Sequence, residues 1–123
     1  MGMTPLVKAG HQIIQGYGAR GITVNSVLYT GAVIVRPESA MLWAAPRNVS
    51  ELTPAHFQGL EGLSIAMLLL GTGKFFAFVP PDVRTALKAQ GITIDSMDTG
   101  AACRTYNVLM AEGRRVAAAL LPV

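Results

Sequence analysis

Residues 65–121 decide the fold, and they read IAMLLLGTGKFFAFVPPDVRTALKAQGITIDSMDTGAACRTYNVLMAEGRRVAAALL. Three apolar runs in this stretch lack helical spacing, which is typical of strands covered on both faces. Two patterns with apolar residues three or four apart lie between them, and Pro or Gly residues mark their ends. We therefore predict strands over 65–70, 92–97 and 115–121 and helices over 81–90 and 99–112.

The order strand, helix, strand, helix, strand has a topological consequence. Crossovers of this kind are right-handed and place the connected strands parallel in one sheet. We expect the three strands to lie side by side, and none of them at a solvent-facing edge with one polar side. The predicted fold class is α/β.

The first part of the chain has the shorter period of strands. Glycines and turn-forming pairs interrupt β-rich sequence here, which predicts successive hairpins that extend or cover the sheet. Thr53-Pro54 provides an N-cap followed by Pro at the first helical position. We predict strands over 11–15, 22–29, 31–36 and 41–44 and a short helix over 54–61.

Length and composition favour one compact domain. The chain has 123 residues, of which 51% are hydrophobic and 14% charged, so disorder, coiled coil and collagen-like repeats are excluded. We expect a single domain over 1–123, with a β-rich half at 1–46 and an α/β half at 53–123.

Charge and cysteine content narrow the possible partners. The chain has ten basic and seven acidic residues. The basic residues are scattered, with Arg114-Arg115 as the only adjacent pair, so we do not expect nucleic-acid binding. Cys103 is the only cysteine, which excludes an intramolecular disulfide, and two histidines are too few for a structural zinc site. We expect no metal and no cofactor.

The sequence also bears on location. Residues 1–10 have no apolar run of the secretory type, and the longest apolar stretches, 65–70 and 116–121, are too short to span a membrane. We expect a cytoplasmic protein that does not cross a membrane.

Three short motifs resemble chemical sites and have structural explanations. Residues 16–21 match GxGxxG but lead into a predicted strand, so no helix N-terminus is available for a pyrophosphate. Gly73-Lys74 is followed by Phe where a phosphate-binding loop has Ser or Thr. Asp98-Thr99-Gly100 occurs once, whereas aspartic protease chemistry needs two carboxylates. These motifs predict turns and a helix cap.

Two loops at the carboxyl ends of predicted parallel strands form a candidate ligand site. Together they offer backbone N–H groups, a helix N-terminus, two cations and a thiol, which favour an anion and a lowered thiol pKa. The alternative is structural: glycines serve tight turns, Arg104 pairs with Asp98, and Cys103 is buried and inert. The candidate ligand-binding residues are Thr72, Gly73, Lys74, Asp98, Thr99, Gly100, Cys103 and Arg104.

A second candidate surface is aromatic. Phe75, Phe76 and Phe78 precede Pro80-Pro81 and are able to present an apolar face to a partner. The alternative is that these side chains pack under the following helix.

Motifs along nearly the whole chain resemble the Mth-like domain family. The resemblance rests on Tyr17-Gly18 with Ile22–Asn25, Leu69–Gly73, Pro80-Pro81, Gly91-Ile92 and above all residues 97–109, MDTGAACRTYNVL. This family of small, largely uncharacterised proteins includes the mitochondrial respiratory complex I assembly factor three. The resemblance implies a three-layer fold, with a mixed central sheet, flanking helices and an additional β-hairpin layer. It implies a scaffold or assembly role and supplies no catalytic residues.

Two functions from different classes follow. The first is a non-enzymatic interaction or assembly factor whose partner is another protein, with a role in respiratory complex assembly implied by the resemblance. The second is a protein or enzyme that binds a small anionic ligand between the Gly71–Lys74 loop and the helix that begins near Thr99. The sequence leaves the partner, the ligand and the oligomeric state open, a homo-oligomer included.

Overall fold

The computed structural model describes residues 10–123 and contains two sheets, two α-helices and two 3-10 helices in this range. Residues 1–9, on which the expected lack of a secretory signal mainly depends, lie outside the described residues. The strands are β1 (Ile14–Gly18), β2 (Gly21–Val24), β3 (Val27–Tyr29), β4 (Val33–Arg36), β5 (Ser39–Leu42), β6 (Met67–Gly71), β7 (Thr93–Met97) and β8 (Val116–Leu120). The helices are η1 (Val49–Glu51), η2 (Pro54–Leu60), α1 (Pro81–Ala89) and α2 (Thr99–Ala111).

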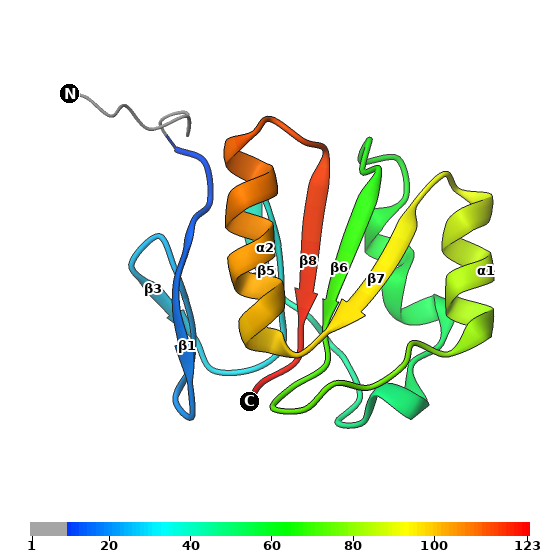
Figure 1. The fold of residues 1–123 in the computed structure, drawn as a ribbon, viewed down its shortest axis with the longest axis horizontal. Coiled ribbons are helices and arrows are strands. Elements are labelled where there is room, and N and C mark those ends of the chain that lie inside the picture. The colour runs from blue at the N-terminus through cyan, green and yellow to red at the C-terminus, as the bar shows by residue number, and fades with distance from the viewer. Residues whose placement is uncertain (1–9) are drawn as a thin grey trace.

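The central sheet is mixed and has the strand order β5-β4-β8-β6-β7 (Figure 1). Strand β6 lies between β7 and β8 and is parallel to both, whereas β4 is antiparallel to β8 and to β5. This confirms the α/β class and the three adjacent parallel strands. Each predicted helix lies within one or two residues of its observed bounds.

The expectation that the strand at 92–97 avoids the sheet edge is wrong. Strand β7 is the last strand of the central sheet, with Thr93 and Asp95 exposed and Ile94 buried between them. The alternation of polar and apolar residues in β7 matches one covered face and one open face. Asp95 also puts a charge on an edge strand, which discourages pairing with other chains.

The single strand predicted over 22–29 is also wrong, because the chain turns in its middle. Asn25 and Ser26 have φ angles of 45° and 69°, and Val24 pairs with Val27. Two consecutive left-handed residues between paired strands form a type I′ hairpin turn. The Asn25 side chain stabilises this turn, since its Oδ1 accepts from the Ile13 N–H at 2.8 Å and its Nδ2 donates to the His11 carbonyl at 3.0 Å.

The remaining N-terminal predictions differ from the structure by small shifts. Strands β4 and β5 form a hairpin joined by Pro37-Glu38, so β5 starts earlier than the predicted 41–44. The predicted helix at 54–61 is the 3-10 helix η2, in which the Thr53 N–H donates to His56 Nδ1 at 2.9 Å.

Three layers result from the two faces of the central sheet. Helix α2 packs on one face and lies between this sheet and the separate β1–β3 sheet (Figure 1). On the other face, η2 and α1 contribute Phe57, Val83 and Leu87 to a second apolar cluster. Successive residues of β8 face opposite clusters, as Ala117 and Ala118 show. Both faces of the sheet are therefore covered at β4, β6 and β8, with β1–β3 as the hairpin layer.

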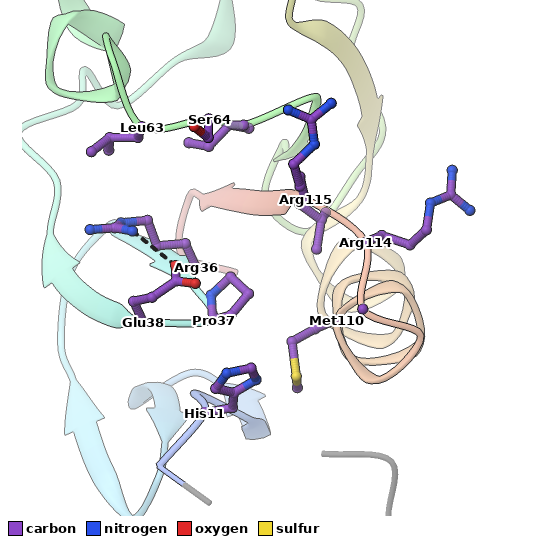
Figure 2. Close-up of a pocket in the computed structure, with 12 residues that line it drawn as sticks. His11, Arg36, Pro37, Glu38, Leu63, Ser64, Met110, Arg114 and Arg115 are labelled. Carbon is purple, nitrogen blue, oxygen red and sulfur yellow. Dashed lines mark hydrogen bonds and ion pairs between the residues drawn. The ribbon is translucent and has the colours of Figure 1, made fainter. Parts of the chain in front are cut away.

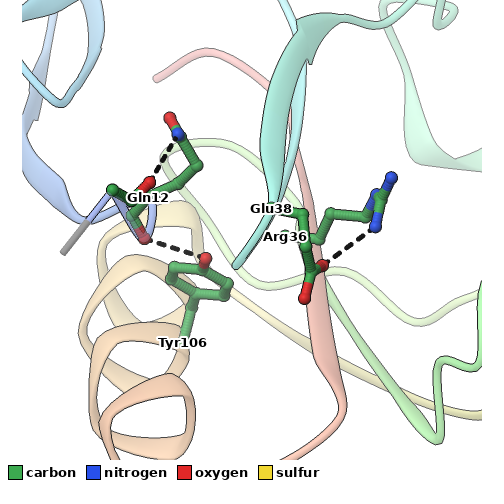
Figure 3. A network of polar contacts seen from close by, with 5 residues as sticks. Gln12, Arg36, Glu38 and Tyr106 are labelled. Carbon is green, nitrogen blue, oxygen red and sulfur yellow. Dashed lines mark hydrogen bonds and ion pairs between the residues drawn. The ribbon is translucent and has the colours of Figure 1, made fainter. Parts of the chain in front are cut away.

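Polar side chains of α2 hold the β1 segment in place. Asn107 makes a two-way contact with the backbone of Ile14, accepting from its N–H at 2.9 Å and donating to its carbonyl at 2.7 Å. The Tyr106 hydroxyl donates to the Gln12 carbonyl at 2.9 Å (Figure 3). Burial of the Tyr106 ring, and then the charge of Glu38, raise the pKa of its phenol above the usual value.

Candidate functional site

A pocket of about 580 Å³ lies at the N-terminus of α2, and we name it the α2 N-terminal pocket. Three segments far apart in sequence form most of it: the β1–β2 turn, the loop after β6 and the first turns of α2. The lining residues are Tyr17, Gly18, Ala19, Gly73, Lys74, Asp98, Gly100, Arg104 and Val123. The structure thus brings together five of the predicted ligand-binding residues: Gly73, Lys74, Asp98, Gly100 and Arg104.

Thr99 positions these segments from behind the pocket. Its hydroxyl is fully buried, accepts from the Gly73 N–H at 2.8 Å and donates to the Leu121 carbonyl at 2.6 Å. Its own N–H donates to the Gly73 carbonyl at 2.9 Å. The close approach requires Gly71, because a Cβ at this position would lie 3.0 Å from the Thr99 Cα. Thr99 is a positioning residue and does not line the pocket.

Thr72 has a similar internal role. Its hydroxyl donates to the Phe75 carbonyl at 2.7 Å and lies 3.1 Å from the Met97 carbonyl, so it ties the loop after β6 to the end of β7. Thr72 is buried and, like Thr99, is absent from the pocket wall.

Asp98 is the N-cap of α2, as the structural interpretation of Asp98-Thr99-Gly100 predicts. Its carboxylate accepts from the Ala101 N–H at 2.9 Å, and its carbonyl accepts from the Ala102 N–H at 3.0 Å. The Ala101 N–H is therefore not among the backbone donors at this helix N-terminus that are free for an anion, because the cap already supplies its acceptor.

Arg104 contacts Tyr17 and not Asp98. Its Nη1 donates to the Tyr17 hydroxyl at 2.6 Å, whereas the ion pairs among residues 10–123 are Arg36–Glu38 and Arg114–Glu112. The Tyr17 ring lies directly over Gly100, where an added Cβ would be 2.7 Å from the tyrosine hydroxyl. The predicted Arg104–Asp98 pair is thus wrong, since the carboxylate serves the cap. The guanidinium retains donors for an anion.

Cys103 does not belong to the site. The residue is 2% exposed and lies in the apolar cluster between α2 and the two sheets. Burial raises the pKa of its thiol to about 12, and the opposing effect of Arg104 is smaller. The prediction of a lowered thiol pKa is wrong, because the third helical residue after Gly100 faces the core and not the pocket.

The aromatic segment is exposed, which contradicts packing under the following helix. Phe75, Phe76 and Phe78 are 75%, 51% and 83% exposed, whereas the neighbouring Val79 is buried. The rings of Phe76 and Phe78 meet edge to face with centroids 4.8 Å apart, and Lys74 Nζ lies 5.8 Å from the Phe75 centroid. We call residues 74–78 the aromatic loop.

Sequence reasoning missed the contribution of the β1–β2 turn to the pocket. Tyr17, Gly18 and Ala19 lie within the GxGxxG match, which has no helix after it and therefore predicts no phosphate site. The sequence does contain a feature that indicates this turn: Gly16 and Gly18 flank Tyr17 and allow a tight turn that carries an aromatic side chain. Only the tertiary structure shows that this turn covers the start of α2.

The described residues were also compared with the requirements for a metal site and for a membrane-spanning helix. Between residues 10 and 123, no cluster of three or more His, Cys, Asp or Glu side chains is placed to hold a metal ion. No helix in the same range has the length and apolar character required to cross a membrane.

Comparison with known proteins identifies relatives along almost the entire chain. An uncharacterized protein of Rhodobacter capsulatus is 36% identical over 115 residues, which cover 94% of this chain and 88% of the relative. The NADH dehydrogenase [ubiquinone] 1 alpha subcomplex assembly factor 3 of Bos taurus is 33% identical over 111 residues. That alignment covers 89% of this chain but 60% of the bovine protein.

Solved structures of similar proteins have the same fold along almost the entire chain. A Bordetella parapertussis protein has a TM-score of 0.85 and 38% identity, covering 94% of this chain and 98% of its own. A Bordetella pertussis protein described as a Mth938-like domain has a TM-score of 0.83 and 31% identity, covering 99% of this chain and 91% of its own. Residues 14–121 match the family described as "Protein of unknown function (DUF498/DUF598)". The chain therefore belongs to the DUF498/DUF598 family of Mth-like domains, as the motif at residues 97–109 suggests.

Proposed function

We propose that this protein is a non-enzymatic assembly factor that binds another protein through the aromatic loop. The observation that carries the proposal is the exposure of three phenylalanine side chains within four positions. Exposed aromatic side chains that are close together are characteristic of protein interfaces, where they act as anchors. The name of the bovine relative indicates the class of partner, a subunit of a respiratory NADH dehydrogenase.

The aromatic loop is suited to binding because it is held at both ends. The Thr72 hydroxyl donates to the Phe75 carbonyl at 2.7 Å, and Val79, which directly follows the aromatic loop, is buried in the core. A loop fixed in this way loses little conformational entropy when a partner binds. The phenylalanines are therefore presented by the fold at little further cost.

The motif at residues 97–109 supports a structural role for the most distinctive part of the sequence. The polar and charged side chains of this motif already make hydrogen bonds within the protein. These side chains are Asp98, Thr99, Arg104, Tyr106 and Asn107. Cys103 is buried with a raised pKa, so it is not suited to be a nucleophile. These contacts favour a scaffold over an enzyme.

Serine substitutions in the aromatic loop test the proposal. We expect Phe75→Ser and Phe78→Ser to leave the melting temperature nearly unchanged, because both side chains are exposed, and to reduce capture of NADH dehydrogenase subunits from the native host. Leu42→Ser is the matched control, since Leu42 is 65% exposed on β5. Equal capture by the phenylalanine variants and the Leu42 variant would contradict the proposal.

The same variants test self-association. If the aromatic loop binds a second copy of the chain, light scattering will show a dimer for the wild type and a monomer for Phe78→Ser. The single cysteine is compatible with a reducing compartment, and we propose that the protein acts in the cytoplasm.

A second candidate function is binding of a small anion in the α2 N-terminal pocket. Lys74 and Arg104 both line this pocket, and the Asp98 carboxylate beside them is engaged in the helix cap. We expect Arg104→Lys to weaken phosphate binding more than Arg47→Lys does, because Lys lacks the two parallel donors of a guanidinium. Phosphate-induced NMR shifts at Gly73 and Gly100 are the measurement. Their absence would contradict this second function.

A further inference from the structure

A second pocket, of about 290 Å³, lies at the other end of α2, and we name it the Arg36–Arg115 pocket (Figure 2). It contains Met110 and Gly113, whereas the α2 N-terminal pocket contains Gly100. The 13 residues of α2 place the two helix ends about 18 Å apart. The two pockets are therefore separate sites.

The charge of the Arg36–Arg115 pocket is positive. Arg36, Arg114 and Arg115 line it together with the single carboxylate of Glu38. That carboxylate is already bound by Arg36 Nη1 at 2.9 Å (Figure 3). In Figure 2 this pair lies on one side of the pocket and Arg114 and Arg115 lie on the other, with the Arg114 guanidinium directed away from the pair and His11 at the bottom of the view. This arrangement leaves an excess of cations around the pocket.

Arg36 contributes a donor that lacks an acceptor. Its Nε is buried and, among the residues that the structure describes, has no hydrogen-bond partner. A buried donor without a partner is unfavourable, and more so on a charged group. Because Nε has no exposed surface, a ligand does not reach it, and the Arg36 donors available to a bound anion are the guanidinium N–H groups that Glu38 does not use.

Arg114 and Arg115 have a structural role that does not extend to Arg36. They follow the C-terminus of α2, where cations interact favourably with the helix dipole. Arg114 also lies 4.0 Å from Glu112, but both side chains are more than half exposed, so this ion pair is weak. Arg36 belongs to β4, so the helix dipole does not explain its presence at the same pocket.

Most of the remaining lining is apolar and defines the body of the ligand, while His11 and Ser64 add polar groups. Pro37, Leu63, Ile65, Met110 and Val116 form walls between the charged groups. Mostly apolar walls with a few charged groups are characteristic of small-molecule sites. The adjacent Ser64 adds a hydroxyl and has a left-handed φ of 55°.

We propose that the Arg36–Arg115 pocket binds a small organic anion, with a carboxylate or phosphate group at the arginines and a short apolar body against Pro37, Leu63 and Met110. This site is independent of the aromatic loop and goes beyond the proposed assembly function.

NMR titration with hexanoate, phenyl phosphate and inorganic phosphate tests the proposal. We expect saturable shifts at the amides of Ser64, Gly113 and Val116 with at least one organic anion, and weaker binding of inorganic phosphate, which lacks the apolar body. Binding confined to Gly18, Gly73 and Gly100, or no saturable shift at Ser64, Gly113 and Val116, would overturn it.

Two variants and a control make the test specific. We expect Arg115→Gln, at an exposed position, to preserve the fold and weaken binding about tenfold. Arg36→Gln removes a cation from the pocket lining, and we expect a folded spectrum with weaker binding of the organic anion than in the wild type. Arg104→Gln, at the other pocket, is the control. Equal weakening by Arg115→Gln and Arg104→Gln would overturn the assignment.

Discussion

The Thr99 hydroxyl joins the loop after β6, the start of α2 and the end of β8. It accepts from the Gly73 N–H and donates to the Leu121 carbonyl, and the residue is fully buried. The arrangement of the α2 N-terminal pocket therefore depends on one buried hydroxyl group. This dependence makes Thr99 the residue at which stability and site geometry are most closely linked.

Thr99→Val tests this role with little change in side-chain shape. The substitution leaves two buried backbone groups without partners, so we expect a loss of about 2–4 kcal/mol in the free energy of unfolding. Urea denaturation is the measurement, and Thr93→Val at an exposed position of β7 is the control. A change below about 0.5 kcal/mol, the range of ordinary surface substitutions, would show that the hydroxyl is not needed.

Cys103 gives a prediction about pH. Burial raises the pKa of its thiol from 9.0 to about 12, so above pH 9 the unfolded chain releases a proton that the folded chain retains. The contribution of the protonated Cys103 thiol to the free energy of unfolding is fully present below pH 9. It is lost as the pH rises towards 12, by up to about 1.4 kcal/mol per pH unit.

Unfolding free energies measured from pH 8 upward check this sign. We expect Cys103→Ala to remove part of the decline, while Tyr106, whose phenol pKa is also raised, continues to contribute. An unchanged slope in Cys103→Ala would be inconsistent with a buried thiol of raised pKa.

Among the elements, the β2–β3 hairpin has the clearest conformational requirement. Ser26 has a φ of 69°, which glycine adopts without the penalty that a Cβ causes. We expect Ser26→Gly to stabilise the protein by about 1 kcal/mol, because Asn-Gly is the preferred type I′ sequence.

Thermal unfolding measures this gain. Ser50→Gly, at an exposed position of η1, is the control and should destabilise, because glycine only adds freedom to the unfolded chain there. A lower melting temperature for Ser26→Gly than for the wild type would contradict the assigned turn.

The same elements show how far sequence reasoning extends. The α1 and α2 boundaries are predictable because Pro81, Asp98 and Gly113 act locally, through caps and backbone preferences. The edge position of β7 is not predictable from Ile92 and Ile94 alone, since it depends on which strand lies beside it. The type I′ turn is suggested by Asn25, but Ser26 is an unusual second residue for it.

In the α2 N-terminal pocket, too, some residues could be predicted from the sequence and others could not. Gly73, Lys74, Asp98, Gly100 and Arg104 share a pocket because the carboxyl ends of parallel strands β6 and β7 meet at one sheet edge. Tyr17 comes from a different sheet, and its contact with Arg104 spans 87 positions in the chain. No local pattern in the sequence indicates such a contact.

At the scale of the whole molecule, the fold has two separate pockets, one of which lies beside the proposed partner surface. The aromatic loop adjoins the α2 N-terminal pocket, since Lys74 belongs to both. The Arg36–Arg115 pocket lies at the opposite end of α2. A protein partner on the aromatic loop is therefore able to bind without covering the second pocket.

Site-specific photocrosslinking in the native host tests the assembly role most directly. Phe78, which is 83% exposed, is replaced by p-benzoylphenylalanine, a photoreactive aromatic residue of similar character. Leu42, 65% exposed on the edge strand β5, carries the same replacement in a control chain. We predict that illumination joins the Phe78 chain to a respiratory NADH dehydrogenase subunit and that the Leu42 chain gives no such product. The same product from both chains, or none from Phe78, would contradict the account.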